Sequence, residues 1–199
     1  MKIVSAVLGL VLGGLAGLAS AAWAAGLVGQ GAGMGSQIDA GGWRSDWTIG
    51  SSAANPWTRA RIARHGLLAL NKDEAVYFTR ARDDAGGALT EGCTYKVSGG
   101  AMPAQWWSLT LYDAASRLPG NTDEALSYDL TDAAAAGDAS AWSFTVSPDP
   151  AQGGWVSSKS AGKFDLTLRL YKPDAALIAA PETALTPPGI EKLGCGEAN

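Results

Sequence analysis

Hydrophobic and polar residues alternate most clearly between Gln105 and Asp113. Trp107, Leu109 and Leu111 fall on one side of a period-two pattern, and the mostly polar residues between them fall on the other. A strand with one buried face requires this arrangement, because successive side chains point to opposite faces of a sheet. The sequence therefore predicts a central strand here, with these three side chains in the core.

Further strands are expected before and after this segment. Phe164 to Tyr171 shows the same period of two, with Phe and Leu alternating against Asp, Thr and Arg. Ala75 to Arg82 and Cys93 to Ser98 are expected to form a hairpin-like unit. Trp142 to Ser147 alternates in the same way and predicts another half-buried strand. Trp43 to Ile49 alternates weakly, which indicates an edge strand or an arm laid on the domain, and Leu126 to Leu130 is expected to form a short strand.

One helix is expected ahead of most of the strands. Asn55 can accept hydrogen bonds from free N–H groups and Pro56 suits a first helical turn, so the pair predicts a helix start. The helix is expected to run to about Leu70 and to dock one face on a sheet. The expected docking face consists of Trp57, Ala60, Ala63 or Arg64, Leu67 and Leu68.

Many short strands separated by Gly and Pro turns, with one helix in front, predict a mainly β domain. The expected architecture is a jelly-roll-like, antiparallel double-sheet sandwich. Strands do not alternate with long helices, which disfavours a parallel α/β sheet. The 199 residues leave room for one such domain, which we expect to span residues 43–199.

The first 28 residues predict a membrane anchor or a signal segment. Ile3 to Val28 holds no charged residue, and Lys2 is the only charge before Asp39. This length favours a retained anchor, which needs about 20 apolar residues, whereas the apolar region of a secretory signal usually has about 7 to 15. Small residues around Ala24 keep cleavage open as the alternative. In both cases Lys2 stays inside, so the domain is expected to face the periplasm, either on a single-pass bacterial inner-membrane anchor or free after cleavage near Ala24.

Glycines suggest two further properties of the N-terminal region. Gly9, Gly13 and Gly17 recur at four-residue spacing, which would let two membrane helices approach closely and form a homodimer; composition alone is the alternative explanation. Residues 29–42 are glycine-rich and are expected to form a flexible tether without regular structure.

The chain has two cysteines, Cys93 and Cys195. Outside the cytoplasm such a pair favours a disulfide over two free thiols. The bridge would close a loop of about 100 residues and tie the proline-rich tail to the predicted hairpin. Two cysteines and one distant histidine are weak evidence for zinc, so neither a metal site nor a cofactor is expected.

The sequence offers no catalytic motif. His65, the sole histidine, falls in the predicted helix beside Arg64, where a structural role is favoured over a place in a catalytic triad. Nucleophile-elbow, phosphate-loop and His-Glu-x-x-His patterns are absent, and Gly99 and Gly100 are interpreted as turn glycines. The net charge of −4 argues against a nucleic-acid partner.

Polar and aromatic residues of the helix and strands form a candidate ligand-binding set. If some converge between helix and sheet, they would make a pocket for an anionic or sugar-like ligand; ordinary placement on a solvated surface is the alternative. The set consists of Arg59, Arg64, Tyr77, Tyr112, Asn121, Arg169 and Tyr171.

A series of motifs resembles domain of unknown function 1214 over about residues 56–195. The motifs are the runs 106–113 and 164–171, together with Asn121, Tyr128, Val146-Ser147-Pro148, Gly154-Trp155 and Pro173. The stretches 56–61 and 68–71, with Glu74 and Tyr77-Phe78, are similar to short membrane-linked members. The resemblance implies a jelly-roll-like β domain and brings no established catalytic residues. Longer members carry domain of unknown function 1254 ahead of this one, and here an apolar segment and a tether stand in that place.

The expected function is that of a non-catalytic envelope protein, membrane-anchored through its N-terminal helix. Its β-sandwich would bind a carbohydrate or small anionic ligand, or another envelope protein. The alternative is an enzyme acting on a carbohydrate or small anionic substrate in a groove between the helix and the sheet.

Overall fold

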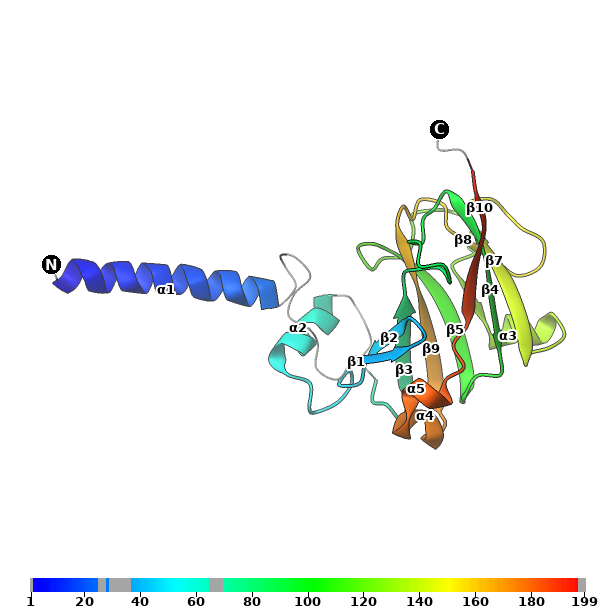
Figure 1. The fold of residues 1–199 in the computed structure, drawn as a ribbon, viewed down its shortest axis with the longest axis horizontal. Helices are drawn as coiled ribbons and strands as arrows, with labels where there is room; N and C mark the ends of the chain where they lie inside the picture. Colours follow the sequence, from blue (N-terminus) through cyan, green and yellow to red (C-terminus); the bar gives the residue numbers. More distant parts are fainter. Residues whose placement is uncertain (1, 25–27, 29–36, 65–69, 197–199) are drawn as a thin grey trace.

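A computed structural model describes residues 2–24, 28, 37–64 and 70–196 of the chain. Helix α1 (Lys2–Ala24) projects away from the β domain (Figure 1). Its residues Ile3–Ala24 are apolar enough and long enough to cross a membrane. A signal sequence near the N-terminus can meet the same criteria, so what is confirmed is an apolar N-terminal helix compatible with either an anchor or a signal.

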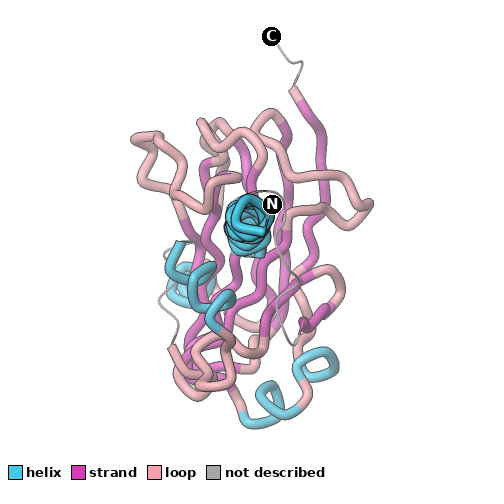
Figure 2. The backbone as a smooth tube through the Cα atoms, turned by 90° about the vertical axis from the view of Figure 1, so that its left-hand side faces the viewer, coloured by secondary structure: helices cyan, strands magenta, loops and turns pink. Residues whose placement is uncertain are grey.

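The β domain consists of two sheets. The six-stranded sheet lies on the side of α1 and the four-stranded sheet lies beyond it (Figures 1 and 2). In spatial order the larger sheet contains β1 (Gln37–Ala40), β2 (Trp43–Asp46), β3 (Ala75–Arg80), β9 (Phe164–Pro173), β5 (Ala104–Asp113) and β6 (Ser127–Asp129). The smaller sheet contains β10 (Gly189–Cys195), β4 (Cys93–Gly100), β7 (Ala141–Ser147) and β8 (Trp155–Ser157). The short helices are α2 (Pro56–Arg64), α3 (Leu130–Ala135), α4 (Ala175–Ala179) and α5 (Pro181–Ala184).

The core lies between the two sheets. Trp107, Leu109 and Leu111 on β5 are at most 1% exposed, which confirms the face predicted from their alternation. From the smaller sheet Trp142 packs against Trp107 with ring centroids 4.5 Å apart. The predicted mainly β, double-sheet fold is confirmed, except that β8 pairs with β7 in parallel. The jelly-roll connectivity itself stays a prediction.

The disulfide joins Cys93 and Cys195. The two residues are also register partners at the ends of β4 and β10. The bridge therefore joins β10, the edge strand of the smaller sheet, to β4 beside it. In this way it ties the C-terminal tail to β4, as predicted.

The predicted hairpin between Ala75 to Arg82 and Cys93 to Ser98 is wrong. β3 pairs with β2 and β9 in the larger sheet, whereas β4 pairs with β10 and β7 in the smaller one. The chain between β3 and β4 crosses from one sheet to the other. Alternation predicts that a strand exists but does not specify its partner, which explains the error.

The predicted tether is partly ordered. Within residues 29–42, the stretch from Gln37 forms β1 and pairs with β2, so the larger sheet begins before Trp43. The glycine-rich composition obscured this four-residue strand. The rest of the predicted tether, residues 29–36, lies outside the described residues.

The predicted docking face of the helix is also wrong where it is described. α2 ends at Arg64, and Trp57 is 45% exposed. Ala60 and Ala63 are exposed as well, while Thr58 faces inward at 2% exposure. The exposure of Trp57, Ala60 and Ala63 shows that this side of α2 is not docked on the sheet. His65, Leu67 and Leu68 lie outside the described residues.

Candidate functional site

The outer face of the larger sheet carries the candidate site. Strands β3, β9 and β5 lie side by side and bury their alternate residues in the core, so the intervening side chains share the opposite face. That face is turned towards α1 and α2 (Figure 1). The outer-face cluster consists of Tyr77, Trp106, Tyr112, Asp165, Arg169 and Tyr171.

Strand register brings these residues together. Arg169 on β9 is the register partner of Tyr77 on β3, and Tyr171 is the partner of Trp106 on β5. At the other end of the strands Asp165 is opposite Tyr112. Directly paired residues have Cβ atoms about 4.5 to 5.5 Å apart, so the cluster forms one continuous surface over three strands.

Arg169 is the central charged group of the cluster. Its Nη1 donates to Thr110 Oγ1 over 2.9 Å, and its Nη2 donates to the Tyr112 hydroxyl. The guanidinium carbon also lies 5.2 Å from the centroid of the Tyr112 ring. These contacts fix the side chain across β5, and among the described residues it forms no salt bridge. Arg169 therefore presents a positioned, half-buried positive charge.

Trp106 and Tyr171 form the aromatic end of the cluster. Their ring centroids are 5.3 Å apart, and both side chains are half-buried. Such a pair offers apolar ring surface to a ligand and keeps a hydroxyl and an indole N–H at its edges.

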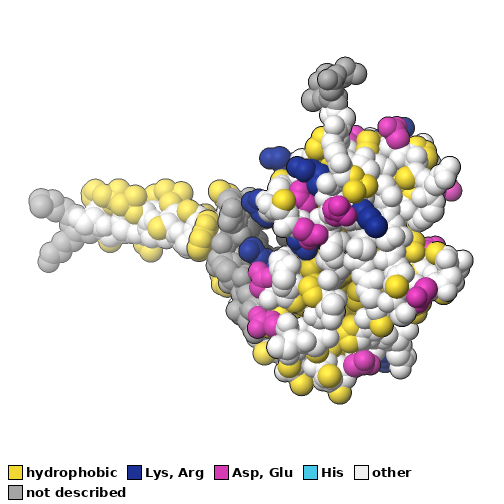
Figure 3. Space-filling view, turned by 45° about the vertical axis from the view of Figure 1, so that its right-hand side comes forward, with side chains coloured by type: hydrophobic (Ala, Val, Ile, Leu, Met, Phe, Trp, Pro, Cys, Tyr) yellow, Lys and Arg dark blue, Asp and Glu magenta, His cyan; other side chains and the backbone are white. Residues whose placement is uncertain are grey.

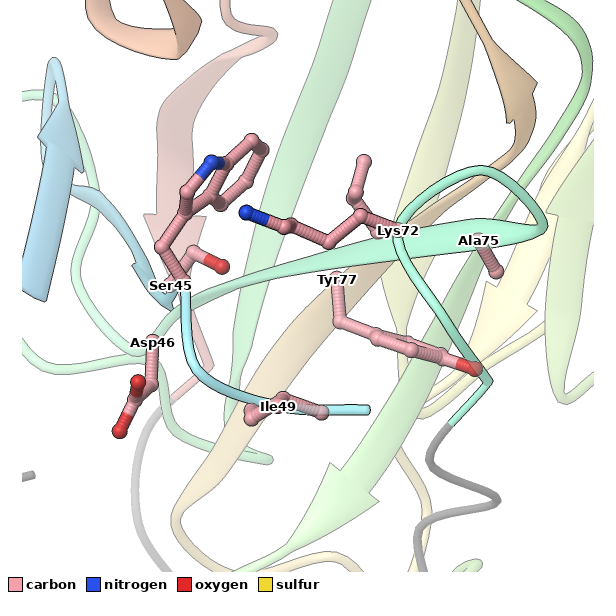
Figure 4. Close-up of a pocket in the computed structure, with 8 residues that line it drawn as sticks. Ser45, Asp46, Ile49, Lys72, Ala75 and Tyr77 are labelled. Carbon is pink, nitrogen blue, oxygen red and sulfur yellow. The ribbon is translucent and has the colours of Figure 1, made fainter. Parts of the chain in front are cut away.

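Tyr77 lies at the covered edge of the cluster. It is buried, although it belongs to the outer face of its strand, because residues 45–49 and Lys72 lie over it (Figure 4). Burial raises the pKa of Tyr77, and the neighbouring Tyr171 adds to the increase. The pocket between these segments has a volume of about 10 Å³, which is room for about one water molecule.

Asp165 is the acidic member of the cluster. Burial raises the pKa of this carboxyl to about 6, and the nearby Asp113 contributes to the increase. A hydrogen bond from Thr167 Oγ1 and the charge of Arg169 act in the opposite direction. A carboxyl in this range can change its protonation near neutral pH.

Two residues of the predicted set, Asn121 and Arg59, do not join the cluster, and the side chain of a third is not described. Asn121 donates to Lys159 O over 2.8 Å, and this bond holds the loop beside β8. Arg59 donates to the carbonyls of Ala54 and Ser52, and these bonds hold the loop ahead of α2. Arg64 ends α2, and its side chain lies outside the described residues. The structure brings together Tyr77, Tyr112, Arg169 and Tyr171.

Trp106 and Asp165 were missed by the analysis of the sequence. Both occupy outward positions in the alternating runs that contain Tyr112 and Arg169. Considering every outward position of those runs would have included both residues. Only the strand register shows that Trp106 lies beside Tyr171 and that Asp165 lies beside Tyr112. Metal-binding groups of three or more His, Cys, Asp or Glu are absent from the described part of the chain.

The fold and this surface define a β domain of double-sheet type with a polar and aromatic outer face, preceded by an apolar helix. Within that class the chain belongs to the family described as "Protein of unknown function (DUF1214)", which matches residues 74–175. The resemblance found in the sequence is thereby confirmed. Among curated proteins, none matches the chain.

Two solved structures are similar to this fold. The VPA0106 protein from Vibrio parahaemolyticus superposes with a TM-score of 0.53 at 20% identity, over 71% of this chain and 36% of that protein. A putative uncharacterized protein from Burkholderia cenocepacia gives a TM-score of 0.38 at 17% identity, over 63% and 31% of the two chains. The chain thus spans about a third of the length of these proteins, and the first of them shares the fold.

Proposed function

We propose that this protein is a membrane-anchored binding module whose outer-face cluster holds a small anionic, sugar-like ligand. In this proposal α1 stays in the bacterial inner membrane and the β domain faces the periplasm. The observation that carries the proposal is the position of Arg169, fixed by Thr110 and Tyr112 on the same sheet face as the half-buried Trp106–Tyr171 pair. The module is non-catalytic.

The chemistry of the cluster supports this class of ligand. A guanidinium has five N–H donors in a planar fork that matches a carboxylate or phosphate, and the contacts above use two of its nitrogens. The apolar face of a sugar ring can pack on the rings of Trp106 and Tyr171. Asp165 lies at the opposite end of β9 and does not contact a ring that is bound there. Arg169 then supplies the preference for an acidic over a neutral sugar.

The envelope location is supported by two independent features. α1 is long and apolar enough to cross a membrane. The Cys93–Cys195 disulfide fits an oxidising compartment, because cytosolic thiols are kept reduced.

An enzyme acting on a carbohydrate or small anionic substrate is the second candidate. Asp165 favours it, since a carboxyl with a pKa of about 6 suits a general acid. The pocket beside Tyr77 does not supply the expected groove between helix and sheet, because its lining residues come from residues 45–49, Lys72 and β3 and not from α2, and it holds about one water molecule.

Calorimetric titration of the full chain in detergent tests the proposal, with D-glucuronate as the acidic probe and D-glucose as the neutral one. Wild type is expected to bind glucuronate more tightly than glucose. Arg169→Gln should weaken glucuronate binding by on the order of 10- to 100-fold, because a charged hydrogen bond is lost. Arg117→Gln, in an exposed arginine on the loop after β5, is the matched control and should bind like wild type.

Equal glucuronate affinity in wild type and Arg169→Gln would remove the basis for this site. Turnover of an aryl glucuronide that disappears in Asp165→Asn would instead favour the enzyme.

A further inference from the structure

Charge is divided unevenly along the β domain. Residues 43–82 hold seven Lys and Arg against three Asp and Glu, whereas residues 83–199 hold seven against fifteen. The chain is acidic as a whole, so the basic segment 43–82 is a local feature. Such asymmetry points to a partner surface of negative charge.

The basic segment lies on the side of the domain nearest α1. It contains β2, α2 and β3, and α2 stands between α1 and the larger sheet (Figure 1). In Figure 3 most of the visible Lys and Arg side chains lie on the side of the domain next to α1, with Asp and Glu side chains among them. The basic segment is therefore the part that a membrane around α1 would meet first.

α2 presents the features of a helix that rests at a membrane interface. It carries Arg59 and two further arginines and has no acidic residue. Trp57 is 45% exposed, and Ala60 and Ala63 are exposed as well, while Thr58 is buried. Exposed tryptophan is enriched at the headgroup level of bilayers, and arginine interacts with anionic headgroups.

Some cations of the segment already have partners. Arg80 Nη2 lies 2.8 Å from Asp84 Oδ1, and Arg44 pairs with Asp39 at 3.3 Å. The Arg44 pair is solvent-exposed and therefore weak. Arg59 donates to the carbonyls of Ala54 and Ser52, which carry no formal charge, and it forms no ion pair among the described side chains. Its positive charge is therefore available to an anionic lipid headgroup.

We infer that α2 and the basic segment 43–82 dock on the anionic phospholipid surface of the membrane that α1 spans, with Trp57 at the interface. Docking fixes the orientation of the domain, because the acidic remainder of the chain is repelled from the same surface. The inference rests on the membrane-anchored form in the proposed function, but not on which ligand, if any, the outer-face cluster binds.

Hydrogen exchange on the full chain tests the inference. The protein is placed singly in nanodiscs of phosphatidylcholine, or of phosphatidylcholine mixed with phosphatidylglycerol, and exchange of α2 is followed by mass spectrometry. Exchange of α2 is expected to be slower by about tenfold with the anionic lipid, given the attraction of each arginine to the surface. Exchange of β9 should be the same in both discs, which reports an intact fold.

Charge reversal separates docking from general electrostatics. Arg61→Glu with Arg64→Glu should abolish the lipid-dependent slowing in α2. Lys159→Glu with Lys163→Glu makes the same charge change at exposed positions outside the basic segment and should leave the slowing intact. Equal exchange of α2 in both lipids overturns the inference. If exchange of α2 is also slow without anionic lipid, and slows further as the protein concentration rises, then a second copy of the chain covers α2. This result overturns the inference as well.

Discussion

Asp165 shows how an outward position on a sheet can become a titrating group. Its strand neighbours Leu166 and Phe164 point into the core, and the alternation of β9 predicts that Asp165 points the other way. The sequence does not show that Tyr112 lies opposite it or that Asp113 is close, because those contacts depend on the register of β5 against β9. The direction of the side chain was therefore predictable, and its altered acidity was not.

The pKa of Asp165 gives a pH-dependent prediction. The folded chain holds this proton up to about pH 6, whereas the unfolded chain releases it near 3.8. The resulting stability is present at low pH and is lost as pH rises from about 4 to about 6. Asp165→Asn keeps an oxygen for Thr167 and cannot ionise, so it should raise the free energy of unfolding at pH 7 by on the order of 1 to 2 kcal/mol, with little change at pH 4.

Urea unfolding followed by tryptophan fluorescence at both pH values measures this effect. Asp138→Asn is the control, because hydrogen bonds from Ser140 lower the pKa of Asp138 and the substitution should not stabilise the protein at pH 7. A loss of stability at pH 7 in Asp165→Asn would contradict the account of this residue.

At the scale of elements, alternation identified the strands that have one face in the core. β5, β7 and β9 are close to their predicted ranges, because the buried face of each strand packs on the opposite sheet. Pairing could not be predicted, since it depends on contacts between distant segments. β1 was missed because a four-residue strand flanked by glycines resembles a tether.

The contact between β4 and β7 explains why Gly99 is a strand residue and not the turn residue that we expected from the sequence. Gly99 was interpreted as a turn residue, but it lies in β4 opposite Trp142, whose Nε1 donates to Gly100 O over 2.8 Å. A Cβ atom at position 99 would lie 2.3 Å from Trp142 Cζ2. The indole therefore occupies the space that any side chain at this position would need.

Gly99→Ala should lower the free energy of unfolding by about 1 to 3 kcal/mol, because Trp142 must shift within a packed core. Thermal and urea unfolding provide the measurement. Gly92→Ala, where an added Cβ would meet nothing within 4 Å, is the matched control and should change stability far less. Equal stability of the two variants would show that Trp142 can move freely.

At the scale of the whole molecule, the sequence predicted an apolar helix, two sheets and a disulfide from local composition and pattern. Each of these features can be predicted from the residues of single segments and from the number of cysteines, without knowing which strands pair. The candidate site depends on which strands lie side by side, so four of the seven proposed residues meet, whereas Asn121 and Arg59 hold loops. The proposed role requires the β domain to be outside the cytoplasm and attached to the membrane.

Intact-mass spectrometry of the full-length protein, isolated from bacterial membranes and treated with an alkylating reagent before and after reduction, tests this requirement most directly. The account predicts a mass that includes residues 1–24, with alkylation of Cys93 and Cys195 only after reduction. A chain that begins near Ala25, or two cysteines that are alkylated without a reductant, would contradict it.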